Sequence, residues 1–381
     1  MKKVIRHPAL LTLSLLLVMV LVSGIFLSSY VSTEPQTLVT ESIEVPENEI
    51  APTPTPPPLP EVKKPEDLSF SEITEELDEL GPISSILMSQ HGELLSESYF
   101  GRMNAGRTHN IKSASKSILS ILVGIAIDRG YFEGTDQPIA DFFPVYFEQN
   151  PDSVKASITI GDLLTMRSGL ASTSRGSYGR WVISNNWVQY ALNQPMRGTP
   201  GVDRIYSTGN THLLAVALSR ASGMSARQFA ERYLFDPMDI RLGGWDRDPQ
   251  GNYMGGNNMA LRPRDLLKIG ELMMNMGEYN GRQIVPTSWI VESVEPVTGR
   301  GNRLNYGYLW FRRKSNGYET VYAYGNGGQY LLILPELESV IAVTTRNGTA
   351  EPTRTYRREL FSTIDRVIVP KLSASFDPER L

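Results

Sequence analysis

The stretch "HNIKSASKSILSILVGIAIDRG", residues 109–130, predicts a buried helix with an unusual first turn. From residue 118 onward almost every side chain is apolar, and Gly130 supplies a C-terminal stop. Lys116 falls in the first turn, where the helix dipole already places partial positive charge. Because the dipole and the apolar neighbours both oppose a cation there, helix stability does not explain Lys116.

Ser113 and Lys116 together form a Ser-x-x-Lys motif. Residues three apart share a helix face, so Ser113 Oγ and Lys116 Nζ can lie within hydrogen-bond reach. Burial and the helix N-terminus are both expected to lower the pKa of the lysine. A partly neutral amine can take a proton from the serine and make it a nucleophile. The structural alternative is that Ser113 caps the helix and Lys116 extends to solvent.

Two later segments carry further candidate residues. "DRIYSTGNTHLL", residues 203–214, places Tyr206 just before a helix, where a phenol can serve as a general base. "AYGNGGQYLLILP", residues 323–335, has Gly327 and Gly328 at the head of a strand, so a substrate can approach the backbone closely. The next amide, that of Gln329, could then face a developing oxyanion. A half-buried core tyrosine and a β-bulge or tight turn are the structural alternatives.

The order of Ser-x-x-Lys, a Tyr-led motif and a Gly-rich late strand resembles class C serine β-lactamases. It equally resembles the related penicillin-binding proteins, esterases and 6-aminohexanoate-dimer hydrolases, and the likeness covers about residues 70–370. The resemblance implies a β-lactamase/transpeptidase-like fold and an acyl-serine mechanism without a cofactor. It makes Ser113 the nucleophile, Lys116 the proton acceptor or relay, and Tyr206 the base for acylation or for activating water. The backbone N–H groups of Ser113 and Gln329 would form the oxyanion hole.

Two positions depart from the β-lactamase pattern. Thr208 stands where those enzymes have an asparagine two residues after the tyrosine, and Asn326 stands at the lysine of their Lys-Thr-Gly motif. The implied substrate-binding triplet is therefore Asn326, Gly327 and Gly328. Because Asn326 offers a neutral amide where those enzymes hold a carboxylate, we expect a preference for neutral esters or amides. Arg346 is the residue that could supply the missing cation from another direction.

The composition excludes several other classes of function. The 381 residues carry a net charge of −4, which does not suggest a nucleic-acid partner. The chain has no cysteine, so disulfides, thiolate catalysis and Cys-ligated zinc are excluded. Its four histidines show no paired metal-ligand spacing, so we expect no metal and no cofactor. No GxSxG motif occurs, and we expect His212 to be structural or to support the site.

The order of the expected elements indicates an α/β protein of the α+β type. A helix is expected in residues 68–81, followed by a β-hairpin with its turn at His91 and Gly92. Several strands follow one another between residues 306 and 347, and a final helix is expected from residue 353. Because strands occur near both ends, the pattern predicts one antiparallel sheet flanked by helices, with an inserted helical region.

The sequence predicts that the chain has three parts. Residues 1–33 combine basic flanking residues with a 19-residue apolar core at 9–27, which is typical of a membrane anchor or, less well, a cleaved signal segment. Residues 34–66 form a Pro-rich linker, with eight prolines between 46 and 65. Residues 67–381 form the β-lactamase-like domain. The charge pattern places this domain on the extracytoplasmic side of a single-pass anchor, or outside the cell if the segment is cleaved.

The function expected from these observations is that of an exported serine hydrolase cleaving an ester or amide. The alternatives are a cell-wall D-Ala-D-Ala carboxypeptidase, penicillin-binding protein or β-lactamase, and a non-catalytic wall- or ligand-binding module on the same fold. The expected partners are a small-molecule ester, amide or peptide substrate and, through the N-terminal segment, the membrane. The natural substrate and the oligomeric state stay open.

Overall fold

The computed structural model describes residues 69–79, 82–297, 305–346 and 354–376. The expected membrane segment at 1–33 and the Pro-rich linker at 34–66 lie outside the described residues. Within the described ranges, no helix has both the length and the apolar character needed to cross a bilayer.

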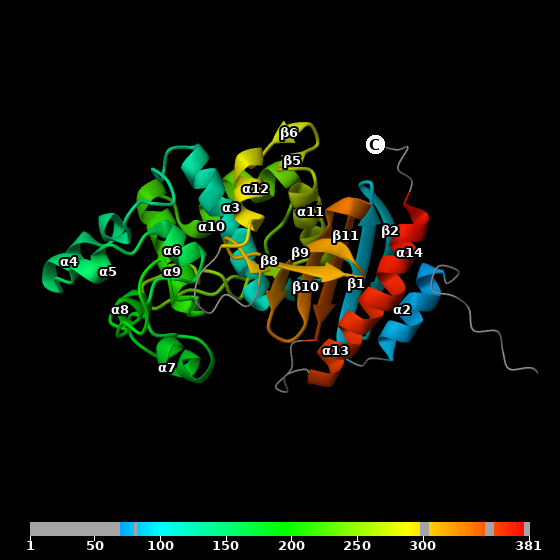
Figure 1. Cartoon of the computed structure of the whole chain (residues 1–381), viewed down its shortest axis with the longest axis horizontal. Coiled ribbons are helices and arrows are strands. Elements are labelled where there is room, and N and C mark those ends of the chain that lie inside the picture. Colours follow the sequence, from blue (N-terminus) through cyan, green and yellow to red (C-terminus); the bar gives the residue numbers. More distant parts are fainter. Residues whose placement is uncertain (1–68, 80–81, 298–304, 347–353, 377–381) are drawn as a thin grey trace, which may run out of the picture. The chain divides into compact units, whose positions relative to one another are not determined.

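A seven-stranded sheet in the order β2-β1-β11-β10-β9-β8-β7 forms the centre of the fold, and every pairing in it is antiparallel (Figure 1). Its strands are β1 (Ile83–Gln90), β2 (Glu93–Tyr99), β7 (Asn305–Tyr306), β8 (Phe311–Ser315), β9 (Tyr318–Gly325), β10 (Gln329–Leu334) and β11 (Ser339–Thr345). Because β1 pairs with β11, the first and the last strands of the described chain lie side by side in the sheet. This arrangement confirms the predicted sheet built from both ends.

The β1–β2 hairpin turns at His91 and Gly92, as the sequence predicted. Both residues have positive φ, 51° and 75° respectively. Two central residues of positive φ are typical of the turn whose twist matches that of the flanking strands.

Side chains alternate between two cores along the central strands. Ile86 and Met88 of β1 point into a core shared with the N-terminal and C-terminal helices, whereas Leu87 between them points into the other core. The first core is covered by α2 (Phe70–Asp78), α13 (Arg354–Thr363) and α14 (Val369–Ser375), which lie together on one face of the sheet in Figure 1. The C-terminal helices contact strands far from them along the chain: Gln90 Nε2 of β1 donates to the Leu372 carbonyl of α14 at 2.9 Å.

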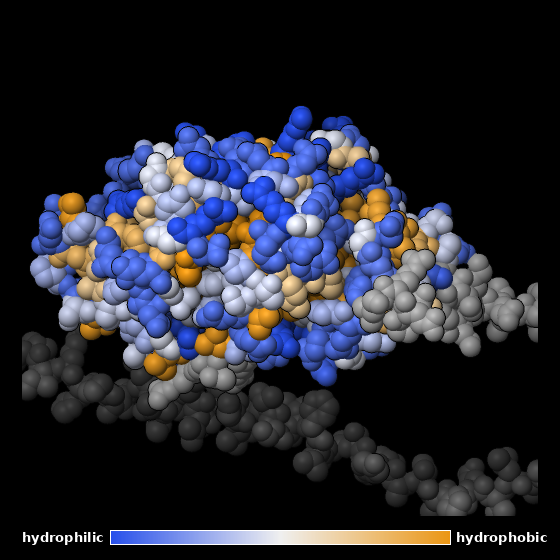
Figure 2. Space-filling model, turned by 90° about the horizontal axis from the view of Figure 1, so that it is seen from above, coloured by the Kyte–Doolittle hydropathy of each residue, from blue (hydrophilic) through white to orange (hydrophobic). Residues whose placement is uncertain are grey.

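The inserted helical region contributes most of the second core. Its helices are α3 (Ser115–Asp128), α4 (Pro144–Gln149), α5 (Ser153–Ala156), α6 (Ile160–Leu164), α7 (Tyr178–Val182), α8 (Trp187–Leu192), α9 (Thr208–Ser222), α10 (Ala226–Ala230), α11 (Pro263–Met274) and α12 (Thr287–Val294). Two short ribbons accompany them: β3 (His109–Asn110) with β4 (Ala260–Leu261), and β5 (Glu278–Tyr279) with β6 (Arg282–Gln283). The face drawn in Figure 2 is largely hydrophilic with separate apolar spots.

Helix α3 is surrounded by protein, which explains its nearly uniform apolar composition. Its residues from Ser115 to Ala126 are all buried, and Gly130 beyond its end has a φ of 73°. Ser117 Oγ donates to the Leu309 carbonyl at 2.7 Å, and Trp289 Nε1 donates to the Ser120 carbonyl at 3.0 Å. These contacts hold the first turns of α3 in place. The candidate residues Ser113 and Lys116 lie at this end of the helix.

Candidate active site

A short 3₁₀ turn, η2 (Lys112–Ala114), carries Ser113 into the start of α3. Lys112 has a φ of 52°, and its N–H donates to Asn110 Oδ1 at 2.9 Å, so the chain turns sharply just before Ser113. Ala114 is the N-cap of α3, and no side chain caps the helix there. The alternative in which Ser113 acts only as a helix cap is therefore wrong.

Lys116 lies beside Ser113 and is buried. Its Nζ is 3.3 Å from Ser113 Oγ, 3.3 Å from Thr208 Oγ1 and 2.6 Å from the Gly256 carbonyl oxygen. Only 2% of the residue is exposed, so the alternative in which Lys116 extends to solvent is also wrong. Burial lowers the pKa of Lys116, and the neighbouring Tyr206 offsets part of that effect. These three hydrogen-bond partners are uncharged, so none of them stabilises the ammonium form as a carboxylate would.

Tyr206 joins the same cluster from the segment before α9. Lys116 Nζ lies 5.3 Å from the centre of the Tyr206 ring, and the Tyr206 carbonyl accepts a hydrogen bond from Ser172 Oγ at 2.6 Å. The structure thus brings the three side chains Ser113, Lys116 and Tyr206 together. All three line one open cleft of about 1840 Å³.

The turn between β9 and β10 forms another part of the cleft wall. Asn326 and Gly327 line the cleft, and Gly327 has a φ of 91°. Gly325, the last residue of β9, packs against η2 so tightly that a Cβ there would lie 2.1 Å from the Ile111 carbonyl oxygen. This close approach places the turn beside Ser113.

Gly328 completes the turn, and Gln329 is the first residue of β10. Gln329 is fully buried, and its side-chain amide makes two hydrogen bonds to the backbone of Thr345, at 2.8 and 2.9 Å. The Gly328 N–H donates to the Gly325 carbonyl at 3.2 Å. Asn326 and Gly327 thus line the cleft beside the nucleophile, whereas the roles of Gly328 and of the Gln329 backbone N–H stay predictions.

Basic side chains are more numerous than acidic ones along the cleft. Besides Lys116, the cleft is lined by Lys112, Arg204, Arg313, Arg357, Arg358 and Arg366, whereas the described lining contains one carboxylate, that of Asp365. Several of these cations have partners: Arg313 forms an ion pair with Asp365, Arg357 donates to the Tyr324 hydroxyl at 2.9 Å, and Arg204 lies over the Tyr306 ring. Arg346 does not line the cleft, and its guanidinium lies near Gly101.

Sequence reasoning missed two residues that hold Lys116, Thr208 and Gly256. Thr208 occupies the position noted as a departure from the β-lactamase pattern, and the structure shows that its hydroxyl contacts the lysine amine. Gly256 has a φ of 67°, and a Cβ there would lie 2.4 Å from Lys116 Cγ. In the sequence, the two consecutive glycines Gly255 and Gly256 could have indicated that the backbone approaches another side chain closely here. In the described part of the chain, no cluster of three or more His, Asp or Glu side chains could hold a metal ion.

Comparisons with known proteins identify the family to which the chain is similar. The sequence model of the family described as "Beta-lactamase" matches residues 82–362. The chain is 25% identical over 279 residues to the 6-aminohexanoate-dimer hydrolase of Paenarthrobacter ureafaciens, a match that covers 68% of this chain and 71% of the relative.

Solved structures share the fold. The octameric penicillin-binding protein homologue from Pyrococcus abyssi superposes with a TM-score of 0.60 at 18% identity, covering 79% of this chain and 76% of the homologue. EstCE1, described as a hydrolase with promiscuous acyltransferase activity, gives a TM-score of 0.63 at 15% identity, covering 77% and 97%. The architecture is therefore β-lactamase/transpeptidase-like, as the resemblance implied. The family model matches well over half of this chain, and the chain therefore belongs to the Beta-lactamase family.

Proposed function

We propose that the protein is a serine hydrolase that cleaves an ester or amide bond through an acyl-serine intermediate. The observation that carries the proposal is the position of Lys116: a buried amine with uncharged partners, 3.3 Å from a serine hydroxyl in an open cleft. Family members named as hydrolases support the reaction class.

The hydrogen bonds of Lys116 suit it to the role of a base. A neutral amine has two N–H groups and one lone pair. If the Gly256 carbonyl and Thr208 Oγ1 accept the two N–H groups, the lone pair is left for the hydroxyl proton of Ser113. Lowering of the pKa of Lys116 by burial increases the fraction of the neutral amine at a given pH.

In the acylation step, Ser113 Oγ bonds to the substrate carbonyl carbon as its proton passes to Lys116. The oxyanion is held by the backbone N–H groups of Ser113 and Gln329, the pair that the resemblance implies. The proton then reaches the leaving alcohol or amine through Lys116 or Tyr206, and the C–O or C–N bond breaks. Water, activated by the same groups, releases the acid and restores Ser113.

For the substrate, we propose an ester or amide that carries no charged group next to the scissile bond. Asn326 is the side chain that the hairpin turn presents to the cleft, and it carries no charge. The cation that opposes this proposal is Arg204, whose guanidinium lies 4.3 Å from the centre of the Tyr306 ring in the cleft wall. Efficient hydrolysis of an anionic substrate that is lost in Arg204→Ala would replace the neutral substrate class with an anionic one.

A cell-wall carboxypeptidase is the second candidate function. The size of the cleft and its basic residues favour it, because a peptide with a terminal carboxylate would fit both.

For the whole protein, we propose export and attachment to the membrane through residues 1–33.

The test is covalent labelling of the full chain in detergent. A fluorophosphonate probe and a labelled penicillin are added in parallel, and peptide mapping identifies the modified residue. The proposal expects the fluorophosphonate on Ser113. Modification of a different residue, or no modification by either reagent, would contradict the acyl-serine mechanism. If penicillin labels Ser113 as efficiently as the fluorophosphonate does, the result would favour the carboxypeptidase.

A further inference from the structure

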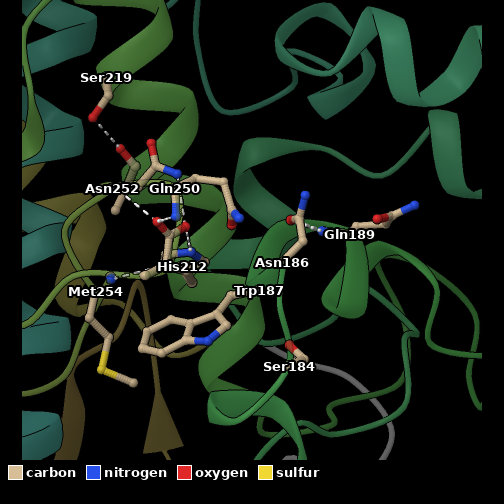
Figure 3. Close-up of polar contacts among 12 residues, drawn as sticks. Ser184, Asn186, Trp187, Gln189, His212, Ser219, Gln250, Asn252 and Met254 are labelled. Atoms are coloured by element: carbon tan, nitrogen blue, oxygen red, sulfur yellow. Dashed lines mark hydrogen bonds and ion pairs between the residues drawn. The ribbon is translucent and has the colours of Figure 1, made fainter.

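A buried pair of side chains, His212 and Asp248, lies outside the cleft lining, and the proposed chemistry does not use it. His212 Nε2, on α9, is 3.1 Å from Asp248 Oδ2, and neither side chain has any exposed surface. Figure 3 shows His212 between Trp187 and the segment that carries Gln250 and Asn252. Burying an imidazole and a carboxylate is costly unless their hydrogen bonds are satisfied, so the pair invites a functional explanation.

The hydrogen bonds of His212 define its tautomer. Its Nδ1 accepts from the Gly255 N–H at 3.3 Å. A backbone N–H can only donate, so Nδ1 carries no proton and Nε2–H points at Asp248. Burial alone would raise the pKa of Asp248, but hydrogen bonds from His212 and Asn252 outweigh that effect and hold the pKa below its usual value.

Packing holds the imidazole in this orientation. The rings of Trp181 and Trp187 lie edge-on to it, with centroids 5.7 and 5.5 Å from that of His212. Trp181 is itself fixed, because its Nε1 donates to the Trp187 carbonyl at 3.0 Å. The ring therefore has little room to rotate away from Gly255.

The residue after Gly255 is the main partner of the catalytic lysine. The Gly256 carbonyl accepts from Lys116 Nζ at 2.6 Å, which is shorter than the other two hydrogen bonds of the amine. The segment cannot easily adjust, because a Cβ on Gly255 would lie 1.9 Å from the Thr211 carbonyl oxygen. A shift of the Gly255 amide would therefore move the Gly256 carbonyl and, with it, Lys116 Nζ.

We propose that His212 and Asp248 are positioning residues for the catalytic lysine. Asp248 holds the tautomer of His212, His212 holds the Gly255 amide, and the adjoining Gly256 carbonyl orients the amine of Lys116 toward Ser113. This inference rests on the proposed function, since it assigns the pair a part in that reaction.

Asp248→Asn is the sharpest probe, because it exchanges one oxygen for an amide nitrogen. Asp248 Oδ1 accepts from two backbone N–H groups, those of Gln250 at 2.9 Å and Asn252 at 2.8 Å, so the new NH₂ cannot occupy that place. It instead takes the place of Oδ2 and faces His212 Nε2, because the other donor to Oδ2, Asn252 Nδ2 at 2.8 Å, belongs to a side-chain amide that can turn its own oxygen toward the new NH₂. The imidazole proton then moves to Nδ1, where it opposes the Gly255 N–H.

A pair of substitutions at His212 separates positioning from packing. In His212→Asn, the amide oxygen can take the place of Nδ1 and still accept from Gly255. In His212→Gln, the amide reaches toward Asp248 but leaves Gly255 without an acceptor. Both lose the ring and its tryptophan contacts, so a purely structural role predicts equal losses.

The experiment measures kcat and KM for a p-nitrophenyl ester, the rate of fluorophosphonate labelling of Ser113, Tm, and the histidine ¹⁵N NMR signature of the tautomer. The account expects Asp248→Asn and His212→Gln to lower kcat and the labelling rate by about 10- to 100-fold, with KM changed less than about 3-fold. His212→Asn should retain at least about 5-fold more activity than His212→Gln at a comparable Tm. In Asp248→Asn, the ¹⁵N signature of His212 should change from Nε2–H to Nδ1–H.

A second histidine–carboxylate pair supplies the matched control. His91 Nδ1 lies 2.8 Å from Glu338 Oε2, and neither residue lines the cleft. His91→Gln and Glu338→Gln should leave kcat within about 2-fold of the unsubstituted protein.

Each outcome bears on the proposal in a defined way. Unchanged kcat in Asp248→Asn despite the switched tautomer overturns it, as do equal losses in the two His212 variants. If His212→Gln does not fold, Asp248→Asn carries the test, and failure of both to fold assigns the pair to stability and rejects positioning. If the unsubstituted protein is not labelled on Ser113, the proposed function fails, whereas the tautomer measurement still shows whether Asp248 controls His212.

Discussion

At the scale of single residues, Lys116 is the side chain around which the site is organised. A buried ammonium with only uncharged partners is an expensive arrangement for a folded protein. The same arrangement favours the neutral amine, which a base requires. The feature that made the sequence unusual is therefore the one that the proposed chemistry needs.

Replacing Ser113 with alanine should abolish acyl transfer while the fold survives. Alanine removes the nucleophile but does not disturb helix α3, because Ser113 does not cap it. We expect kcat for a p-nitrophenyl ester to fall by roughly three or more orders of magnitude, with Tm within a few degrees of the unsubstituted protein. Wild-type esterase activity in this variant would show that the nucleophile lies elsewhere.

Replacing Asn326 with lysine should shift substrate preference toward anions. The change adds a cation to the cleft wall beside Ser113, and a charge-assisted contact adds about 1–3 kcal/mol. We expect kcat/KM for nitrocefin to rise by roughly 5- to 150-fold relative to a short-chain p-nitrophenyl ester. Asn326→Gln is the matched control, and an equal gain there would mean that charge is not responsible.

The sequence predicted the Ser113–Lys116 contact because only local helix geometry is involved. It did not predict the other partners of the lysine, Thr208 and Gly256, which lie 92 and 140 residues further along the chain. Contacts of that kind depend on how α9 and the Gly255–Gly256 segment pack against α3. No local pattern encodes that packing.

At the scale of elements, the β9–β10 hairpin positions the wall opposite the nucleophile. The sequence predicted a Gly-rich turn at the head of a strand, with the Gln329 N–H as the amide that faces the oxyanion, and the role of that amide stays a prediction. Successive side chains of a strand point to opposite sides, so the register of β10 buries the Gln329 side chain and lets Tyr330 line the cleft. The structure places the turn at Asn326 and Gly327 and buries Gln329.

Replacing Gly325 with alanine should push this hairpin away from Ser113. A Cβ there would meet the Ile111 carbonyl at 2.1 Å, and backbone cannot yield as a side chain can. We expect kcat to fall at least about 10-fold and stability to drop by about 1–3 kcal/mol, measured by kinetics and urea unfolding.

Gly134→Ala is the control for that change, because a Cβ at Gly134 meets nothing within 4 Å. It should leave both quantities near those of the unsubstituted protein. Normal activity in Gly325→Ala would mean that the hairpin does not set the geometry of the site.

At the scale of the whole molecule, the site is assembled from segments that lie far apart in the chain, between residues 112 and 366. Its cleft is lined by η2 and α3, by the Tyr206 segment, by strands β8–β10 and by the C-terminal helix α13. The sequence predicted the sheet built from both ends, because strand-like segments lie near both termini. It could not predict that α13 would line the cleft, since nothing in a single helix specifies which strands it covers.

Deleting residues 354–381 should prevent folding. The deletion removes six buried side chains of the core on one face of the sheet: Tyr356, Leu360, Ile364, Ile368, Val369 and Leu372. At about 1.5–3 kcal/mol each, their loss is comparable to the total stability of about 5–15 kcal/mol of a typical domain. Size-exclusion chromatography and circular dichroism should show aggregated or unfolded protein. A folded monomer would mean that this core is dispensable.

The pH dependence of Ser113 labelling by a fluorophosphonate probe tests the central claim, that Lys116 is the base for Ser113. Burial lowers the pKa of Lys116, so the rate should rise with pH and level off below the ordinary lysine pKa of about 10.4. Lys116→Arg, whose guanidinium stays protonated, should label at least about 100-fold more slowly, with no such rise. Equal labelling of the two proteins across the whole pH range would contradict the account.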